Sequence, residues 1–453
     1  MTRSLRRDQV FRLFTEEMLE VVRALSEESE RRGFRLCLVG GPVRDLVLGR
    51  AVGDVDLLLE APGFSKEGVA DLAQEVLPDP VKVVGYGRFG TARVEVGSVK
   101  LDVALARRER YRAVGALPTV ESATLEEDLF RRDFSVNALA IDLTSRSSGN
   151  RMALIDPTGG SEDLARGRLR VLHDQSFHDD PTRALRAARL GARLGFGLDR
   201  RTRSVLRRAL EDEVFARVSG DRIRREIEKV FHDPLHGLDP VLALRRMDEW
   251  GLLKALDPGL VLPSAAVLPL RRFGKAVARP PWRSRRLRPW VAGLSIWFAE
   301  LPPVVRQRVL GRLAVRGEAT EQITGFSRFR KQKLAALSRA RGRGAVDGLL
   351  AGTTEESLHA LHAGADPAVR KQISRWAAED RSETIPVTGS DLLKLGLEGA
   401  ALGQVLARLR AGFLDGELMN REEALALAQE LLRRRQARAS REQKARPRPK
   451  ADR

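Results

Sequence analysis

The sequence predicts an α+β protein, with a small mixed β-sheet in the first part of the chain and helices in the remainder. Two observations predict this class. Short apolar runs bounded by glycines recur between residues 34 and 143, which is typical of strands. After about residue 172 the apolar residues recur at helical spacing, and strand patterns almost vanish. The 453 residues are enough for about three domains.

The elements of the first part follow one another closely. Residues 8–33 carry apolar side chains at helical spacing and predict a helix. Residues 34–40 predict a strand that ends in two glycines, and residues 42–49 begin with proline, end with glycine and predict a short helix. The remaining predictions are a strand at 54–60, a helix at 66–77, a three-stranded meander at 82–105, and a strand or helix–strand junction at 135–143.

The second part is predicted to be helical up to about residue 436. A stretch rich in proline, arginine and tryptophan interrupts it at 279–290. Trp282 and Trp290 flank four arginines there, and two interpretations stay open: RNA binding by stacking and phosphate pairing, or tryptophans tucked into the helical core. Residues 433–453 have almost no apolar side chains, which predicts a disordered basic tail.

Charge and composition narrow the function. The chain has 80 Lys and Arg residues against 61 Asp and Glu residues, a formal net charge of +19. A polyanion such as nucleic acid is therefore the expected partner, and a merely soluble basic surface is the alternative. No run of about 18 apolar residues predicts a membrane span, and the N-terminus does not read as a secretory signal. The single cysteine, Cys37, cannot form an internal disulfide, so a cytoplasmic location is expected.

A glycine pair between a strand and a helix predicts a phosphate cradle. Gly40 and Gly41 let the backbone approach a phosphate chain closely, and the free N–H groups of the following helix would face it. Arg44 lies one turn further and can reach the same phosphates. An ordinary strand–helix turn is the alternative.

Three carboxylates are candidates for metal binding. Asp54 and Asp56 lie two apart at the start of a strand, so both side chains project from one face. Asp102 is expected on a neighbouring strand, between apolar residues. Mg²⁺ prefers such oxygen ligands together with substrate phosphates, which is the layout of two-metal nucleotidyl transfer. A solvated strand edge is the alternative for the first two, and a surface-facing position is the alternative for Asp102.

These segments resemble the class II CCA-adding tRNA nucleotidyltransferases and the related bacterial poly(A) polymerases, within the polymerase-β-like superfamily. The resemblance covers about residues 34–232 in the family's order. It is carried by GGPVRD and GDVD (40–56), the long run ending in RRDFSVNALAIDL (106–143), IDPTGGSEDLARGRLRVL (155–172), FHDDPTRALRAARLGARLGF (177–196) and SGDRIRREIEKVF (219–231).

The resemblance implies roles for individual residues. Asp54 and Asp56 match the metal-binding acids, and Asp102 matches the acid that completes the catalytic set. Gly41 and Arg44 match positions that hold the triphosphate. The family motif that contacts the nucleotide is matched by Arg132, Asp133 and Asn137.

The helix near residue 180 is expected to select the base. Asp180 and Arg183 match the pair that reads the Watson–Crick edge of CTP or ATP, and Arg186 and Arg189 continue the basic stripe as predicted nucleotide contacts. A carboxylate accepts from the amino group that C and A share and that U lacks. Simple N-capping by Asp180 and a solvated arginine face are the alternatives. Asp179 stands where the family has Glu, and its role is left open.

The resulting prediction is a template-independent enzyme that adds C and/or A to the 3′ end of tRNA from CTP and ATP with Mg²⁺, releasing pyrophosphate. Its expected parts are a nucleotidyltransferase head (1–172), a helical neck for base selection (173–233), a helical body (234–330), a tRNA-binding helical tail (331–435) and a disordered basic extension (436–453). A-only addition, CC-only addition and poly(A) tailing are the alternatives. In the family, a loop like the one between Asp102 and Arg131 is associated with the switch to A incorporation, so the resemblance disfavours C-only addition. Residues 87–91 lack the basic residue and histidine of the poly(A) polymerases.

Overall fold

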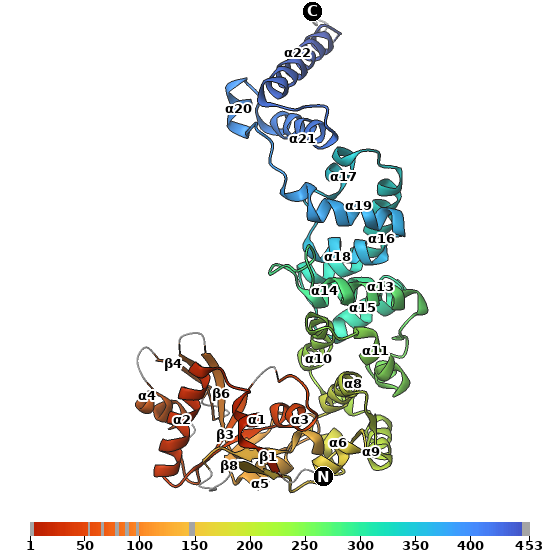
Figure 1. Ribbon diagram of the computed structural model, residues 1–453. Coiled ribbons are helices and arrows are strands. Elements are labelled where there is room, and N and C mark those ends of the chain that lie inside the picture. Colours follow the sequence, from red (N-terminus) through yellow and green to blue (C-terminus); the bar gives the residue numbers. More distant parts are fainter. Residues whose placement is uncertain are drawn as a thin grey trace, which may run out of the picture. The chain divides into compact units, whose positions relative to one another are not determined.

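The computed structural model describes residues 4–52, 55–64, 68–77, 81–86, 90–96, 99–144 and 150–445 (Figure 1). The chain divides into two compact units, Met1–Glu226 with Leu242–Gly259, and Ile227–Val241 with Leu260–Arg453. All the described strands lie in the first unit, and the described elements of the second unit are helices. The predicted α+β class is therefore confirmed. No described helix is long and apolar enough to cross a membrane.

The first unit is built on an eight-stranded mixed sheet. Its strand order is β1-β10-β9-β2-β3-β6-β5-β4. Among the described neighbours within this sheet only the β3–β6 pair is parallel, and it places two central strands side by side in the same direction. The strands are β1 (Ser4–Arg6), β2 (Arg35–Val39), β3 (Asp56–Glu60), β4 (Val81–Tyr86), β5 (Thr91–Val96), β6 (Val99–Leu105), β9 (Ala140–Asp142) and β10 (Arg151–Ile155).

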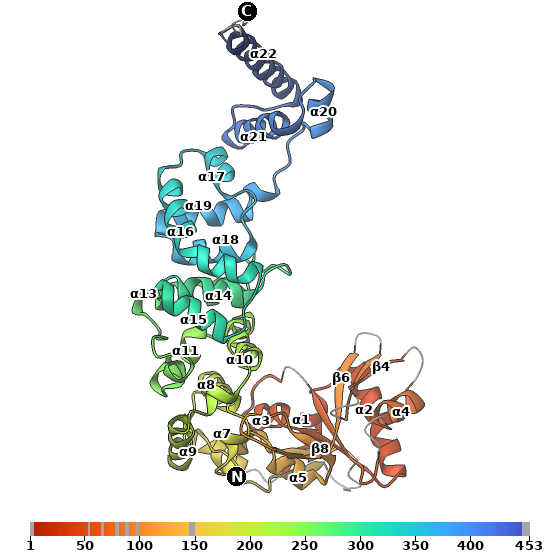
Figure 2. The same ribbon diagram turned by 180° about the vertical axis from the view of Figure 1, so that it is seen from behind.

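The central strand β2 is buried on both faces. Leu36 to Val39 are all at most 3% exposed, which explains the continuous apolar run. On one face of β2 packs α2 (Glu16–Arg31); its neighbour α4 (Gly68–Val76) packs beside it on β4 and β5, as Figure 2 shows from behind. On the other face Cys37 and Val39 join a core that includes Leu129 of α5 (Leu125–Phe130). Covering both faces fixes the end of β2, from which the next helix begins.

Two predictions for the first unit are wrong in detail. The helix expected at 8–33 is two helices, α1 (Arg7–Phe11) and α2, because the hydroxyl of Thr15 caps α2 by accepting from the backbone N–H of Met18 at 3.3 Å. The region expected as a loop before Arg131 contains a hairpin of β7 (Arg107–Arg110) and β8 (Thr119–Ser122). The meander at 82–105 is confirmed; part of its predicted turns lies outside the described residues.

Helices α7 to α12 follow the sheet. The elements up to residue 256 that have not yet been named are α3 (Gly41–Val47), η2 (Ser135–Asn137), α6 (Gly160–Ala165), β11 (Arg168–Leu169), α7 (Ser176–Asp179), α8 (Thr182–Leu194), β12 (Gly197–Leu198), α9 (Arg200–Glu211), η3 (Val214–Arg217), α10 (Gly220–His232), η4 (Asp233–His236), α11 (Pro240–Glu249) and α12 (Leu252–Leu256).

The later helices confirm the predicted break at 279–290, which falls between α13 and α14. Trp282 is 6% exposed and its ring centroid lies 4.0 Å from that of His362, so this tryptophan belongs to the core. The helices are α13 (Ser264–Ala276), α14 (Pro289–Phe298), α15 (Pro303–Arg312), α16 (Glu318–Arg339), α17 (Arg343–Leu350), α18 (Glu355–Gly364), α19 (Pro367–Ala378), η5 (Asp380–Ser382), α20 (Gly389–Lys394), α21 (Gly399–Asp415) and α22 (Arg421–Ala445).

The end of the chain differs from the expected disordered extension. Helix α22 continues to Ala445, so residues 436–445 are helical, and residues 446–453 lie outside the described part. The run RRRQARASREQK contains good helix formers, which favours continuation of the helix. The boundaries predicted between neck, body and tail stay predictions.

Candidate active site

A cavity of about 510 Å³ in the first unit brings together most of the predicted site residues. Arg189 and Asp102 are not among the residues that line it, and Asp54 lies outside the described residues. The predicted residues that line it are Gly40, Gly41, Arg44, Asp56, Arg132, Asp133, Asn137, Asp180, Arg183 and Arg186.

The glycine pair forms one wall of the cavity between β2 and α3. Gly40 has φ +76°, a conformation that side chains disfavour, and a Cβ there would lie 2.8 Å from Nη1 of Arg132. A Cβ at Gly41 would lie 3.6 Å from Nη2 of Arg44, so glycine leaves that guanidinium uncovered on this side. The backbone thus comes close to two arginines, as a phosphate cradle requires.

Arg44 is only 5% exposed, and neighbouring side chains hold its guanidinium in place. Its Nε and Nη2 donate to the two carboxylate oxygens of Asp45 at 2.9 and 2.8 Å, and Nη1 donates to Oδ1 of Asn137 at 2.7 Å. Burial lowers the pKa of Arg44, and the neighbouring carboxylate of Asp45 opposes that effect. A guanidinium remains charged at any physiological pH, so the cavity keeps a fixed cation beside the glycines.

Asp128 organises the two arginines of the RRD motif. It is fully buried; Oδ1 accepts from Nη2 of Arg131 at 2.6 Å and Oδ2 accepts from Nη2 of Arg132 at 3.0 Å. Burial alone would raise the pKa of Asp128, but the two guanidinium groups hold it below the usual value. The sequence analysis missed Asp128, although its spacing of three and four residues from the arginines on a helix was a usable signal.

Asp133 and Asn137 connect the cradle with helix α8. Asp133 accepts from Nδ2 of Asn137 at 3.1 Å and from Nη1 of Arg186 at 3.2 Å. Burial would raise the pKa of Asp133, but Arg186, the Asn137 amide and Arg183 lower it. The half-buried amide of Asn137 is bonded at both its oxygen and its nitrogen, as its place in an apolar run demands.

Asp180 and Arg183 also meet at this cavity. Oδ1 of Asp180 accepts from the backbone N–H and hydroxyl of Thr182 at 3.0 and 2.6 Å, so the capping interpretation holds together with a place in the cavity wall. Arg183 is 4% exposed. It donates to Oγ of Ser176 and to the carbonyl of Arg131 at 2.8 and 3.0 Å. A solvated face is therefore excluded for Arg183.

The rest of the stripe is also engaged with protein. Arg186 pairs with Asp133, and Nη1 of Arg189 donates to Oε2 of Glu226 at 3.1 Å. Asp179 lies outside the cavity lining, with Oδ2 3.8 Å from Nε2 of His173, and burial raises its pKa.

Two of the predicted acids lie side by side on the sheet. Asp56 and Asp102 are register partners on the parallel strands β3 and β6, so their side chains share one face. Asp102 is paired bidentately with Arg93, at 2.7 and 2.8 Å. Adjacent carboxylates suit a divalent cation, which Asp56 and Asp102 would hold and which would neutralise phosphate charge. Within the described residues no group of three His, Cys, Asp or Glu side chains is close enough to hold a metal.

The β7–β8 hairpin completes the cavity with residues that the sequence analysis did not single out. The hydroxyl of Tyr111 donates to Glu109 at 2.6 Å, and Glu109 accepts from Nη1 of Arg131 at 2.8 Å. Arg222 of α10 donates to the carbonyl of Gly115 at 2.5 Å and to Oδ1 of Asp180 at 2.8 Å. The hairpin is thus linked both to the RRD motif and to the residue expected to read the base.

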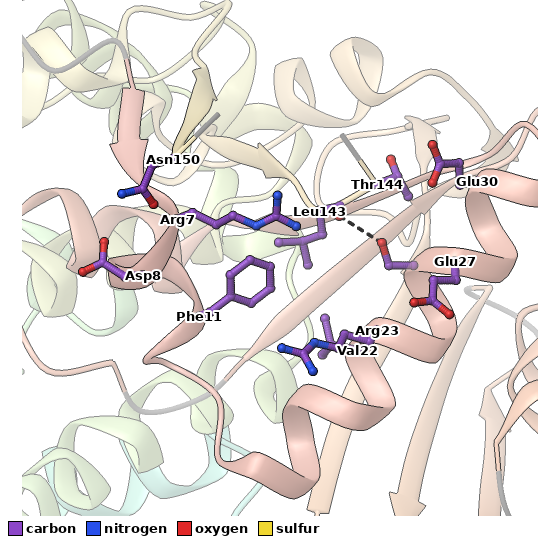
Figure 3. Close-up of a pocket in the computed structure, with 11 residues that line it drawn as sticks. Arg7, Asp8, Phe11, Val22, Arg23, Glu27, Glu30, Leu143, Thr144 and Asn150 are labelled. Carbon is purple, nitrogen blue, oxygen red and sulfur yellow. Dashed lines mark hydrogen bonds between the residues drawn. The ribbon is translucent and has the colours of Figure 1, made fainter. Parts of the chain in front are cut away.

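A second cavity, of about 540 Å³, lies elsewhere on the first unit (Figure 3). It is formed by α1, α2 and the residues around Leu143, and the guanidinium of Arg7 stands 5.3 Å from the ring centre of Phe11. No predicted site residue that the structure describes lines it.

Comparisons with known proteins agree with this geometry. Residues 36–170 match the family model "Poly A polymerase head domain". An A-adding tRNA nucleotidyltransferase from Halalkalibacterium halodurans is 30% identical over 433 residues, which cover 93% of this chain and 94% of that protein. One from Geobacter sulfurreducens is 30% identical over 424 residues, but the chain spans only 46% of that longer protein.

Solved structures of similar fold cover nearly the whole chain. An apo CCA-adding enzyme matches with a TM-score of 0.72 and 26% identity over 94% of this chain and 99% of that one. The Thermotoga maritima CCA-adding enzyme complexed with tRNA matches with a TM-score of 0.68 and 26% identity, over 95% and 100% of the two chains. With the cavity that joins the GGPVRD, RRD and DDPTR motifs, these likenesses show that the chain belongs to the tRNA nucleotidyltransferase family, whose members include A-adding and CCA-adding enzymes.

Proposed function

We propose that the protein adds nucleotides to the 3′ end of tRNA without a nucleic-acid template, using ATP, CTP or both, and that it does so in the cytoplasm. One observation carries the proposal: the predicted triphosphate cradle and the predicted base-reading pair line a single cavity. The 3′ hydroxyl would attack the α-phosphate in line, and pyrophosphate would leave. Fixed cations at Arg44 and Arg132 would stabilise the charge that develops on the phosphates.

The family generally depends on a divalent metal, and we propose that the ion here is Mg²⁺, held by Asp56 and Asp102 together with Asp54. Magnesium keeps oxygen ligands and commonly bridges carboxylates and substrate phosphates. Arg93, the partner of Asp102, would then have to share that carboxylate with the ion. The predicted division into head, neck, body and tail is proposed with the same roles as before.

Addition of A is the step that the relatives support most. Both relatives described above are A-adding, and a CC-adding enzyme from Deinococcus radiodurans is 36% identical over only 53% of the chain. The deciding experiment supplies three tRNAs, which lack all three, the last two or only the last of the CCA nucleotides, with CTP, ATP or both. Extension of only the last substrate by ATP indicates A-only addition, extension of all three indicates full CCA addition, and unlimited A addition to unrelated RNA indicates tailing.

Replacing Asp56 tests the enzymatic proposal directly. Asp56→Ala removes a carboxylate from the cavity, so nucleotide transfer is expected to fall at least about a thousandfold while tRNA affinity stays within about twofold. Primer extension and filter binding measure the two effects. Asp71→Ala, an exposed acid on α4, serves as the matched control. Transfer at the wild-type rate in Asp56→Ala would refute the role of this acid.

A further inference from the structure

We propose that Asp45 is a positioning residue that serves two parts of the site at once. It orients Arg44 toward the triphosphate, and through Arg193 it holds the helix that carries Arg183. The inference rests on the proposed function, because it assumes that Arg44 binds phosphate and that α8 selects the base.

The contact between Arg44 and Asp45 fixes the direction of the guanidinium. Consecutive residues of a helix do not normally face each other, yet here the two side chains form a bidentate pair, and each is only 5% exposed. Together with Asn137, this pair uses three of the five N–H groups of Arg44. One N–H on each terminal nitrogen remains without an acceptor among the described residues.

Those two remaining N–H groups point to a ligand site. The Cβ position of Gly41 lies 3.6 Å from Nη2 and 3.9 Å from Nη1 of Arg44, so both nitrogens lie next to the glycine that leaves them uncovered. A buried guanidinium with N–H groups to spare favours an anion, and a phosphate oxygen would satisfy them. Asp45 is what holds the guanidinium in this orientation.

The same carboxylate reaches helix α8. Oδ2 of Asp45, which accepts from Arg44, also accepts from Nη2 of Arg193 at 3.1 Å. Arg50, just after α3, donates to the carbonyls of Arg193 and Leu194 at 3.2 and 3.3 Å, so this end of α8 is tied to the cradle twice. Among the described residues, the carboxylate of Asp45 accepts hydrogen bonds only from arginine side chains.

Helix α8 transmits the constraint toward the base. Arg183 lies ten residues before Arg193, about 15 Å along the same helix. A helix behaves as a stiff rod over this length, so fixing its last turn limits how far its first turn can shift or rotate. Asp45 therefore affects both phosphate binding and base choice, whereas Arg193 affects base choice alone.

The two effects can be measured separately because inorganic tripolyphosphate has phosphates but no base. Asp45→Asn and Arg193→Gln are made in the full chain, and calorimetry with Mg²⁺ gives the affinity for tripolyphosphate and for ATP, CTP, UTP and GTP. Asp45→Asn is expected to weaken tripolyphosphate binding at least tenfold and to reduce the preference for the favoured nucleotide over UTP at least fivefold. Arg193→Gln is expected to reduce that preference by a similar factor while tripolyphosphate binding stays within twofold.

Arg166→Gln, which removes an exposed ion pair with Glu162 on α6, is the matched control and should change neither quantity. Unchanged tripolyphosphate binding in Asp45→Asn, an unchanged preference in Arg193→Gln, or equal loss of tripolyphosphate binding in both variants would each overturn the inference. If Asp45→Asn does not fold, the Arg193→Gln arm still decides the coupling. Binding needs no transfer to tRNA, so a wild-type protein that binds nucleotides but extends no tRNA contradicts the proposed function and leaves this test intact.

Discussion

At the scale of single residues, three arginines that line the first cavity are each held by oxygen atoms of the protein. Arg44 is held by Asp45, Arg132 by Asp128, and Arg183 by a hydroxyl and a carbonyl. Removing such a cation from a low-dielectric site costs more than losing a surface charge, because its partners are left buried and unpaired. Substitutions here should therefore alter ligand binding far more than substitutions of exposed arginines.

Arg183→Ala should weaken base selection. Loss of a charged hydrogen-bond donor costs about 1.5–3 kcal/mol, so discrimination against UTP and GTP is expected to fall by about tenfold to a hundredfold. Competition assays with one favoured and one disfavoured nucleotide measure the ratio. Arg207→Ala, an exposed arginine on α9, should leave it unchanged. Wild-type discrimination in Arg183→Ala would leave this arginine with a purely structural role.

The site residues that could be predicted from the sequence are those that belong to a local motif with a recognisable chemical role. Gly40, Arg44 and Asn137 were identified from motifs, and all three line the cavity. Asp45 was missed because its role depends on Arg193, which only the fold brings to it, whereas Asp128 was missed although its arginine partners lie three and four residues away. The pair of Arg44 and Asn137 is separated by 93 positions, and the pair of Arg193 and Asp45 by 148. Spacing along the sequence does not indicate pairs so far apart.

At the scale of elements, apolar periodicity predicted most helices and the central strands, and it failed where periodicity is weak. The β7–β8 hairpin reads RRER and TVES, which contains almost no apolar residues, so its pairing is invisible in the sequence pattern. The break between α1 and α2 was missed for a different reason. The apolar spacing of α1 continues in phase into α2, so the helix start that Thr15 caps does not interrupt the pattern.

Replacement by alanine should have opposite effects on stability at two helical glycines of the second unit, because α14 packs closely against α10 at the first and the second has open space. A Cβ at Gly293 would lie 2.1 Å from Cδ1 of buried Phe231, so Gly293→Ala must displace the ring and should cost about 1–3 kcal/mol of stability. Gly325, inside α16, has nothing within 4 Å of its Cβ position, so Gly325→Ala should stabilise by about 0.5–1 kcal/mol. Thermal unfolding measures both. A gain in stability from Gly293→Ala would show that this contact is loose.

His362 on α18 should make the second unit sensitive to acid. Burial lowers its pKa to about 4, with Arg370, His359 and Arg272 acting in the same direction. Between about pH 6.5 and 4 the unfolded chain binds a proton that the folded chain does not, so stability must fall as the pH falls, by at most about 1.4 kcal/mol per pH unit. Denaturation followed by tryptophan fluorescence at pH 4.5 to 7 measures the slope.

His362→Gln should flatten that slope, because the side chain no longer titrates. His236→Gln, at an exposed position in the same unit, should leave it as in the wild type. An equally steep slope in His362→Gln would assign the acid sensitivity to other groups.

At the scale of the whole molecule, the excess of positive charge should govern RNA affinity. Contacts between cations and phosphates release counterions, so the logarithm of the affinity falls linearly with the logarithm of the salt concentration. The net charge of +19 and the proposed tRNA substrate together predict a steep dependence. The last eighteen residues add to it, with seven basic and two acidic side chains from Gln436 to Arg453.

Neutralising the basic residues from 436 to 453 tests the contribution of their charge to RNA affinity while the chain length stays the same. A full-length variant with the seven basic residues replaced by glutamine keeps the chain length, and it should bind tRNA several-fold more weakly than wild type at about 50 mM salt. The difference should shrink at about 200 mM salt, since the released counterions then gain less entropy. Filter binding over this range gives both slopes, and the same assay with Asp71→Ala gives the control. Equal slopes for the variant and the wild type would mean that these basic residues lie off the RNA, and the dependence would then belong to the rest of the helical unit and the head.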